Sequence, residues 1–137
     1  MKRSKGFTLI EIMVVVVILG VLAALVVPSV IDRIVDARIQ AAKSDIRTIE
    51  SALSLYKIDN YKYPTTEQGL IALIERPSAS DAPNWNVEGY LKKLPTDPWG
   101  NQYLYTNDGT KIEIYTLGSD SRPGGESEAG DIHWTDL

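Results

Sequence analysis

Glu11 is the side chain of this sequence whose chemistry most clearly needs a partner. It lies near the start of an apolar run from Phe7 to Val27, and residues 12–27 include no charged or hydrogen-bonding side chain. A carboxylate placed in hydrocarbon costs about 2.5–3.5 kcal/mol on insertion scales. We therefore expect another group to compensate for the charge of Glu11.

A second set of acidic side chains lies in segment 117–134, where Asp120, Glu126, Glu128 and Asp131 are interspersed with glycines. Calcium takes about six to eight oxygen ligands from carboxylates, backbone carbonyls and water. Glycines allow the backbone to turn its carbonyls inward, but the regular spacing of an EF-hand is missing. The composition alone is also typical of a mobile acidic loop, so both interpretations stay open.

The sequence shows no arrangement typical of an enzyme. His133 is the one histidine, and the absence of cysteine excludes disulfides and thiolate metal sites. We expect His133 at the surface, and no nucleophile stands beside a general base in a recognisable motif. The formal net charge of −4, with no basic stripe, also argues against a nucleic-acid partner.

The apolar run is long enough to cross a membrane, since a helix from Phe7 to Val27 measures roughly 30 Å at about 1.5 Å per residue. The basic residues before it place the N-terminus in the cytoplasm. A secretory signal peptide has a shorter apolar core and a small-residue cleavage site, for which Pro28-Ser29 is a poor match. A plain membrane anchor fits the length but leaves Glu11 unexplained.

The segment Lys5-Gly6-Phe7-Thr8-Leu9-Ile10-Glu11 resembles the N-terminal signature of the type IV pilin and pseudopilin family. The resemblance implies that a prepilin peptidase cuts between Gly6 and Phe7 and methylates the new amino group of Phe7. It also implies that Glu11 pairs with the N-terminal ammonium of a neighbouring subunit. The costly carboxylate would then serve self-assembly.

Beyond Pro28, apolar residues recur in steps of four and three, the spacing of one helix face. We expect this stripe to dock a long helix onto the rest of the domain, and Pro28 to kink that helix. The stripe consists of Ile31, Val35, Ile39, Ala42, Ile46, Ile49, Leu53 and Tyr56.

The other face of this helix has like charges four residues apart, Asp32 with Asp36 and Lys43 with Arg47. Such pairs mildly destabilise an isolated helix. Either they are solvated surface charges, or the acidic pair of one subunit meets the basic pair of the next.

The second half of the chain predicts short elements. Thr65 and Gln68 have the spacing of a capping box, which predicts a short helix ending before Pro77. Asp97-Pro98-Trp99-Gly100 predicts a type I turn. Asn107-Asp108-Gly109, between two alternating segments, predicts a β-hairpin.

The stretches YPTTEQGL and LPTDPWGNQYLY extend the resemblance, over essentially the whole chain, to the major pseudopilins of bacterial type II secretion. In that family calcium holds the C-terminal loop, where type IV pilins use a disulfide. The resemblance implies calcium ligation by the Leu117 carbonyl and by the carboxylates of Asp120 and Asp131. The intervening loop would supply the other ligands, for which the candidates are Ser119, Ser127 and Glu128.

The resemblance implies an α+β fold of the type IV pilin kind. A long N-terminal helix, transmembrane and then amphipathic, would pack on a small antiparallel β-sheet with a calcium-stapled C-terminal loop. The chain would divide into a cleaved leader (1–6), a transmembrane and assembly helix (7–28) and a periplasmic globular domain (29–137).

The implied function is that of a structural subunit of the pseudopilus, the filament that drives export of folded proteins across the outer membrane. The implied partners are further copies of the chain, minor pseudopilins, the prepilin peptidase and the inner-membrane assembly platform. Two alternatives stay open: a minor or surface type IV pilin used in adhesion or DNA uptake, and a membrane-anchored periplasmic binding module.

Overall fold

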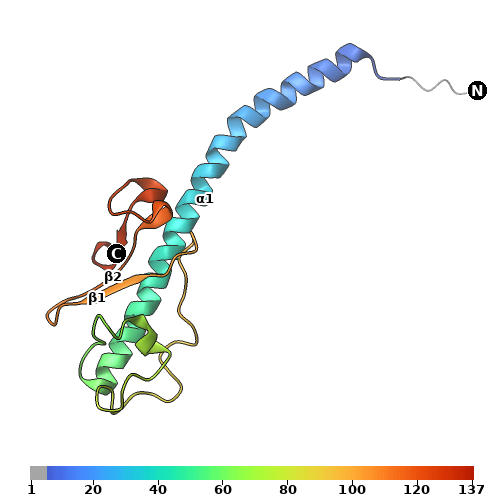
Figure 1. The fold of residues 1–137 in the computed structure, drawn as a ribbon. Coiled ribbons are helices and arrows are strands. Elements are labelled where there is room, and N and C mark those ends of the chain that lie inside the picture. Colours follow the sequence, from blue (N-terminus) through green and yellow to red (C-terminus); the bar gives the residue numbers. More distant parts are fainter. Residues whose placement is uncertain (1–5) are drawn as a thin grey trace, which may run out of the picture. The chain divides into compact units, whose positions relative to one another are not determined.

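A computed structural model describes residues 6–137, apart from the side chains of Pro28 and Ser29. The expected leader therefore lies outside the described residues except for Gly6. One long helix precedes a three-stranded antiparallel sheet of order β1-β2-β3 (Figure 1), which confirms the expected α+β fold of a long helix and a small antiparallel sheet. The elements are α1 (Leu9–Asn60), β1 (Leu104–Asn107), β2 (Ile112–Thr116), β3 (Ile132–His133) and four short 3₁₀ helices, η1 (Leu70–Leu73), η2 (Gly118–Asp120), η3 (Ser127–Ala129) and η4 (Trp134–Asp136).

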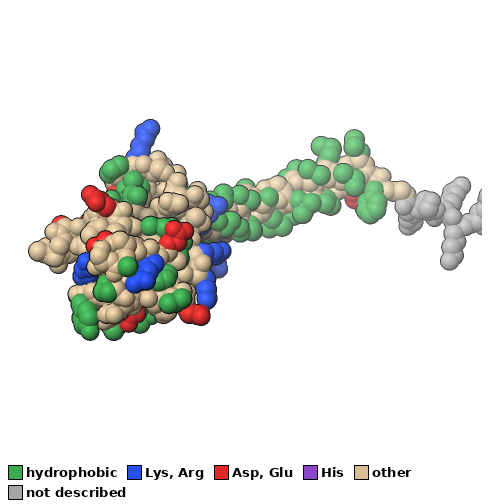
Figure 2. Space-filling model, turned by 60° about the horizontal axis from the view of Figure 1, so that its bottom comes forward, with side chains coloured by type: hydrophobic (Ala, Val, Ile, Leu, Met, Phe, Trp, Pro, Cys, Tyr) green, Lys and Arg blue, Asp and Glu red, His purple; other side chains and the backbone are tan. Residues whose placement is uncertain are grey.

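The chain consists of two compact units, one ending at Asp36 and the other comprising Ala37–Leu137. The backbone of α1 stays helical through Pro28, so the missing hydrogen bond of the proline does not end the helix. Among the described helices, α1 is the one long and apolar enough to cross a membrane, and no protein atoms bury its apolar stretch. Figure 2 shows the hydrophobic side chains that cover the visible face of this stretch.

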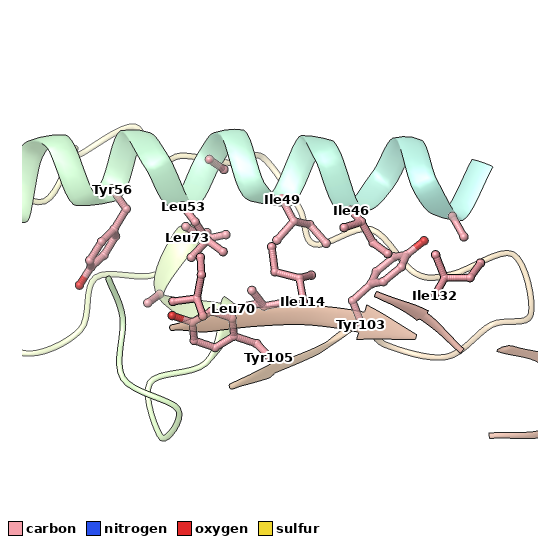
Figure 3. Packing of buried hydrophobic residues seen from close by; sticks show 14 of the residues in the cluster. Ile46, Ile49, Leu53, Tyr56, Leu70, Leu73, Tyr103, Tyr105, Ile114 and Ile132 are labelled. Atoms are coloured by element: carbon pink, nitrogen blue, oxygen red, sulfur yellow. The ribbon is translucent and has the colours of Figure 1, made fainter. Parts of the chain in front are cut away.

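In the second unit, α1 buries one face against the sheet. Ile46, Ile49 and Leu53 point toward the strands, where Ile114 of β2 lies (Figure 3), and all four side chains are fully buried. Burying each such side chain contributes about 1.5–3 kcal/mol relative to leaving it exposed. The predicted stripe is confirmed from Ala42 to Tyr56.

The stripe prediction is wrong at its first residue. Ile31 is 54% exposed, and Val35 and Ile39 are only half-buried. The buried part of the stripe lies in the second unit, which begins at Ala37. Ile31 therefore belongs with the exposed apolar side chains of the first unit.

The predicted hairpin is confirmed. β1 and β2 pair antiparallel, with Asn107 opposite Ile112. At the turn, Gly109 takes a φ of 92°, and Asp108 Oδ1 accepts hydrogen bonds from the N–H groups of Thr110 and Lys111, both at 2.8 Å. These bonds, the one from Lys111 above all, lower the pKa of Asp108 to about 2.

β3 pairs antiparallel with β2, placing Thr116 opposite Ile132. β3 has no signature in the sequence, because a two-residue strand is too short to show a period of two. Its presence means that β2 and β3 hold both ends of segment 117–131 on the same sheet.

The side chain of Thr66 covers the outer edge of β1 at Asn107. The N–H of Asn107 donates to Thr66 Oγ1 at 2.8 Å, and the Thr66 hydroxyl donates to the carbonyl oxygen of Asn107 at 3.0 Å. The Asn107 side-chain amide and the Tyr105 hydroxyl both donate to the carbonyl oxygen of Pro64 at 2.8 Å. The two bonds with Thr66 occupy the backbone N–H and C=O of Asn107, which a further strand would need.

The expected capping box at Thr65 is confirmed, and a short helix follows before Pro77, but it is a 3₁₀ helix that begins only at Leu70. The N–H of Thr65 donates to Gln68 Oε1 at 2.9 Å, and the N–H of Gln68 donates to Thr65 Oγ1 at 3.2 Å. Gly69 then takes a φ of 59°, which leaves the helical path. The chain forms one turn and the four-residue 3₁₀ helix η1.

Candidate functional site

Glu11 caps the N-terminus of α1. Its Oε2 accepts hydrogen bonds from the N–H of Thr8 at 3.0 Å and from the Thr8 hydroxyl at 3.1 Å. In return, the N–H of Glu11 donates to Thr8 Oγ1 at 3.3 Å. This is a reciprocal capping box, which the sequence analysis missed although Thr-x-x-Glu is its signature. The capping donors are neutral, and within residues 6–137 the carboxylate forms no ion pair.

The predicted cleavage bond lies in irregular chain before this cap. Gly6 and Phe7 are both exposed and precede the first helical residue, Leu9. A peptide bond outside a helix is accessible to a peptidase without unfolding. The geometry therefore fits cleavage between Gly6 and Phe7.

Segment 117–131 folds back on itself between β2 and β3. The residues that follow β2, around Gly118, form its outgoing arm, and those that precede β3, around Gly130, form its return arm. Gly118, on the outgoing arm, takes a φ of 67°, and a Cβ there would clash with the carbonyl oxygen of Glu128 and lie 2.8 Å from that of Gly130. The close approach of the two arms requires glycine at position 118. It also brings backbone carbonyl oxygens of the return arm against the residue that follows Leu117.

Asp131 has a buried carboxylate oxygen that lacks a partner. Its Oδ2 accepts a hydrogen bond from the N–H of Gly124 at 2.9 Å. Its Oδ1 is buried and has no hydrogen-bond partner within the described part of the chain. An unsatisfied buried acceptor is costly, and a cation would satisfy it, so Asp131 fits the role of calcium ligand that the family resemblance implies.

The other candidate ligands differ in their surroundings. Asp120 is exposed in η2, and its Oδ1 accepts a hydrogen bond from the N–H of Arg122 at 3.0 Å. Ser119 and Ser127 are exposed on the two arms. Between residues 6 and 137, no three acidic or histidine side chains form a group that could hold a metal ion. A calcium site in this loop therefore depends on backbone carbonyls.

The carboxylate of Glu128 is directed toward α1. Arg38 Nη1 donates to Glu128 Oε1 at 2.8 Å, and the indole N–H of Trp99 donates to the same oxygen at 3.4 Å. The Arg38 guanidinium, and to a lesser extent Trp99, lower the pKa of the Glu128 carboxyl. Through its bond to Arg38, the side chain of Glu128 connects the C-terminal loop to α1.

Asp97 has a buried carboxylate, although its sequence motif predicts only a turn. The turn is confirmed, because the N–H of Gly100 donates to the carbonyl oxygen of Asp97 at 2.9 Å. Asp97 Oδ1 accepts hydrogen bonds from the N–H groups of Trp99 at 3.0 Å and Asn101 at 2.8 Å. Asp97 Oδ2 accepts one from the hydroxyl of Thr116 at 2.5 Å. Thr116 is distant in sequence, and no local pattern reveals this bond.

His133, expected at the surface, is half-buried on β3. Its ring stacks on Tyr115 of β2 with a centroid separation of 5.0 Å and an interplanar angle of 14°. Its Nδ1 lies 4.0 Å from Glu113 Oε1. These contacts indicate that His133 packs as part of the sheet.

Two family models match the chain in consecutive segments. The model described as type II secretion system (T2SS), protein G, matches residues 29–135. The model described as the prokaryotic N-terminal methylation motif matches residues 1–27.

Curated relatives and a solved structure give the same result. The type II secretion system core protein G of Pseudomonas aeruginosa is 55% identical over 134 residues, covering 96% of this chain and 94% of the relative. That of Vibrio cholerae is 49% identical, covering 96% and 92%. The crystal structure of the major pseudopilin from the type 2 secretion system of enterohaemorrhagic Escherichia coli shares 41% identity and a TM-score of 0.63, over 73% of this chain and 89% of that one.

Proposed function

Because the chain belongs to the type II secretion system protein G family, we propose that it polymerises into the pseudopilus that drives export of folded proteins across the outer membrane. The main support is that residues 29–135 match this family while residues 1–27 match the N-terminal methylation motif. The domain match favours a pseudopilin over a surface pilin or a monomeric binding module. The role is structural and requires no catalytic step.

The first step of maturation that we propose is removal of residues 1–6. A prepilin peptidase would cut the exposed bond between Gly6 and Phe7 and methylate the Phe7 amine. Mass spectrometry of the membrane-extracted protein should then give a chain that begins at Phe7 with one added methyl group. A mature chain that begins at Met1 would contradict this step.

The assembly role of Glu11 follows from its need for a countercharge. The capping box with Thr8 provides hydrogen bonds, but it leaves the negative charge in an apolar segment. The Phe7 ammonium of a neighbouring subunit would neutralise that charge. An otherwise costly carboxylate would thereby favour polymer over monomer.

Two variants of Glu11 separate capping from charge pairing. Glu11→Gln keeps an amide oxygen for the capping box but removes the charge, whereas Glu11→Ala removes both. If charge pairing drives assembly, both variants should reach the membrane at parental levels and form few filaments by electron microscopy. Parental filaments with Glu11→Gln would show that capping, and not the charge, is what assembly requires.

We also propose that calcium binds between the arms of segment 117–131. The ligands would be the Leu117 carbonyl and the carboxylates of Asp120 and Asp131, with carbonyl oxygens of the return arm as further candidates. Calcium would supply positive charge for the buried Asp131 Oδ1 and would tie the two arms together. Ser119 and Ser127 remain candidates, whereas the Glu128 carboxylate is already paired with Arg38.

Thermal unfolding of the full-length protein in detergent tests this site. Calcium at a hundredfold excess over Kd should add about 2.7 kcal/mol to the free energy of unfolding, if calcium binds only the folded state. Magnesium should add much less, because its small octahedral shell fits such ligands poorly. Asp131→Asn or Asp120→Asn should remove the calcium increment, while His133→Ala should keep it. A parent protein insensitive to calcium would exclude the site.

The proposed location is the inner membrane, with the N-terminus in the cytoplasm and the domain in the periplasm. The apolar part of α1 and the preceding basic residues support this orientation. The proposed partners are further copies of the chain, minor pseudopilins, the prepilin peptidase and the assembly platform. Protease protection in spheroplasts would test the orientation, because only a periplasmic domain is digested without lysis.

A further inference from the structure

We infer that Asp97 and Thr116 are positioning residues that orient the Leu117 carbonyl for calcium. The inference rests on the calcium site proposed above. Both residues are almost fully buried, with exposed fractions of 3% for Asp97 and 1% for Thr116. Their side chains join the turn at residues 97–101 to the end of β2, directly before the outgoing arm of the loop.

The hydrogen bonds form a chain with a defined direction. The N–H of Gly118 donates to Thr116 Oγ1 at 3.2 Å, and the Thr116 hydroxyl donates its single proton to Asp97 Oδ2. The other oxygen of Asp97 is occupied by two backbone N–H groups of its own turn. Since a carboxylate only accepts hydrogen bonds, the Thr116 lone pairs remain available to Gly118.

The hydrogen bond from Gly118 to Thr116 fixes the direction of a carbonyl group. The N–H of Gly118 and the C=O of Leu117 belong to one planar trans peptide unit, in which they point in opposite directions. Holding the N–H against Thr116 therefore turns the Leu117 carbonyl away from it. The direction of this proposed calcium ligand is thus set before an ion arrives.

The same turn also reaches the return arm. Trp99 donates its backbone N–H to Asp97 Oδ1 and its indole N–H to Glu128 Oε1. Glu128 in turn accepts the hydrogen bond from Arg38 of α1. One buried aspartate therefore supports both arms: one through Thr116, the other through Trp99.

The test compares three variants of the full-length protein in detergent, by calorimetric titration with calcium chloride. Thr116→Val preserves the shape of the side chain but removes the hydroxyl, whereas Thr116→Ser retains it. Tyr103→Phe is the matched control, because it also removes a buried hydroxyl that donates to a carboxylate, that of Asp45 at 2.9 Å. That carboxylate belongs to α1 and not to the turn at residues 97–101.

Thr116→Val should weaken calcium binding about tenfold, equivalent to the roughly 1.4 kcal/mol of a lost orienting hydrogen bond. Thr116→Ser should restore near-parental affinity. Tyr103→Phe should lower the Tm without calcium and leave the calcium Kd unchanged. If Thr116→Val does not fold, Asp97→Asn replaces it, because a side-chain N–H would then compete with Gly118 for the Thr116 oxygen.

The measurements distinguish failure of the calcium site from failure of the positioning role. A parent that binds no calcium would overturn the calcium site, and this inference with it. A parent that binds calcium, beside a Thr116→Val variant of equal affinity, would overturn the positioning role alone. Equal weakening by Tyr103→Phe would also overturn it, because general destabilisation would then explain the effect.

Discussion

Arg38 and Glu128 connect α1 to the C-terminal loop by an ion pair whose strength depends on pH. The Arg38 guanidinium lowers the pKa of Glu128 below its ordinary value of 4.5. A carboxyl with a lowered folded-state pKa contributes its full stabilisation above the unfolded-state pKa and loses it as the pH falls through the folded-state pKa. The Arg38–Glu128 ion pair therefore contributes to the free energy of unfolding at neutral pH, and this contribution disappears in acid.

We predict that Arg38→Gln lowers the Tm near pH 7. The difference from the parent should shrink as the pH falls from the ordinary pKa of a glutamate through the lowered pKa of Glu128, because the carboxylate then becomes protonated. Thermal unfolding between pH 3 and 7 measures this difference. Arg47→Gln, an exposed position on the same helix, is the control and should show a smaller effect. An Arg38→Gln deficit that is constant with pH would contradict an ionic contribution.

At the residue scale, the sequence indicated which side chains could bind a cation, but it did not reveal the contacts between residues distant in the chain. Asp131 was predicted as a ligand from its residue type and the family resemblance, and its orphaned oxygen fits that role without testing it. The bonds of Glu128 to Arg38 and of Asp97 to Thr116 join residues far apart in the chain. Only the packed fold brings these partners together, so no local spacing could reveal them.

At the element scale, the buried face of α1 determines the stability of the second unit. We predict that Ile49→Ala costs about 2–5 kcal/mol, since it leaves a cavity beneath a fully buried side chain. Leu55→Ala is the matched control on the same helix, where the leucine is 54% exposed, and should cost far less. Urea unfolding of both variants measures the difference, and equal costs would contradict the assignment of the buried face.

Long periodic elements were predictable, whereas short ones were not. The stripe on α1 and the hairpin turn at Asp108 follow from spacing and turn chemistry alone. The short helix expected after Thr65 begins only at Leu70, because Gly69 adopts a positive φ that its local sequence permits but does not require. β3 escaped prediction because its two residues form a strand only through pairing with β2.

At the scale of the whole molecule, the charges on α1 provide a test of packing between subunits. Asp36 and Lys43 are separated by about 10 Å along the helix, so pairing of unlike charges requires a neighbour shifted along its axis. We predict that Asp36→Lys reduces filament formation and that adding Lys43→Asp partly restores it, as counted by electron microscopy. Glu88→Lys, at an exposed site, is the control, and additive damage without rescue would mean that the charges are merely solvated.

The closed edge of β1 has a consequence for how copies of this chain can join. An open strand edge is a template on which identical chains can stack into amyloid-like aggregates. Here Thr66 occupies the backbone N–H and C=O of Asn107, and the opposite edge strand, β3, has only two residues. Growth by adding strand to strand is thus disfavoured at both edges. The helices are then the surfaces through which the proposed pseudopilus would assemble.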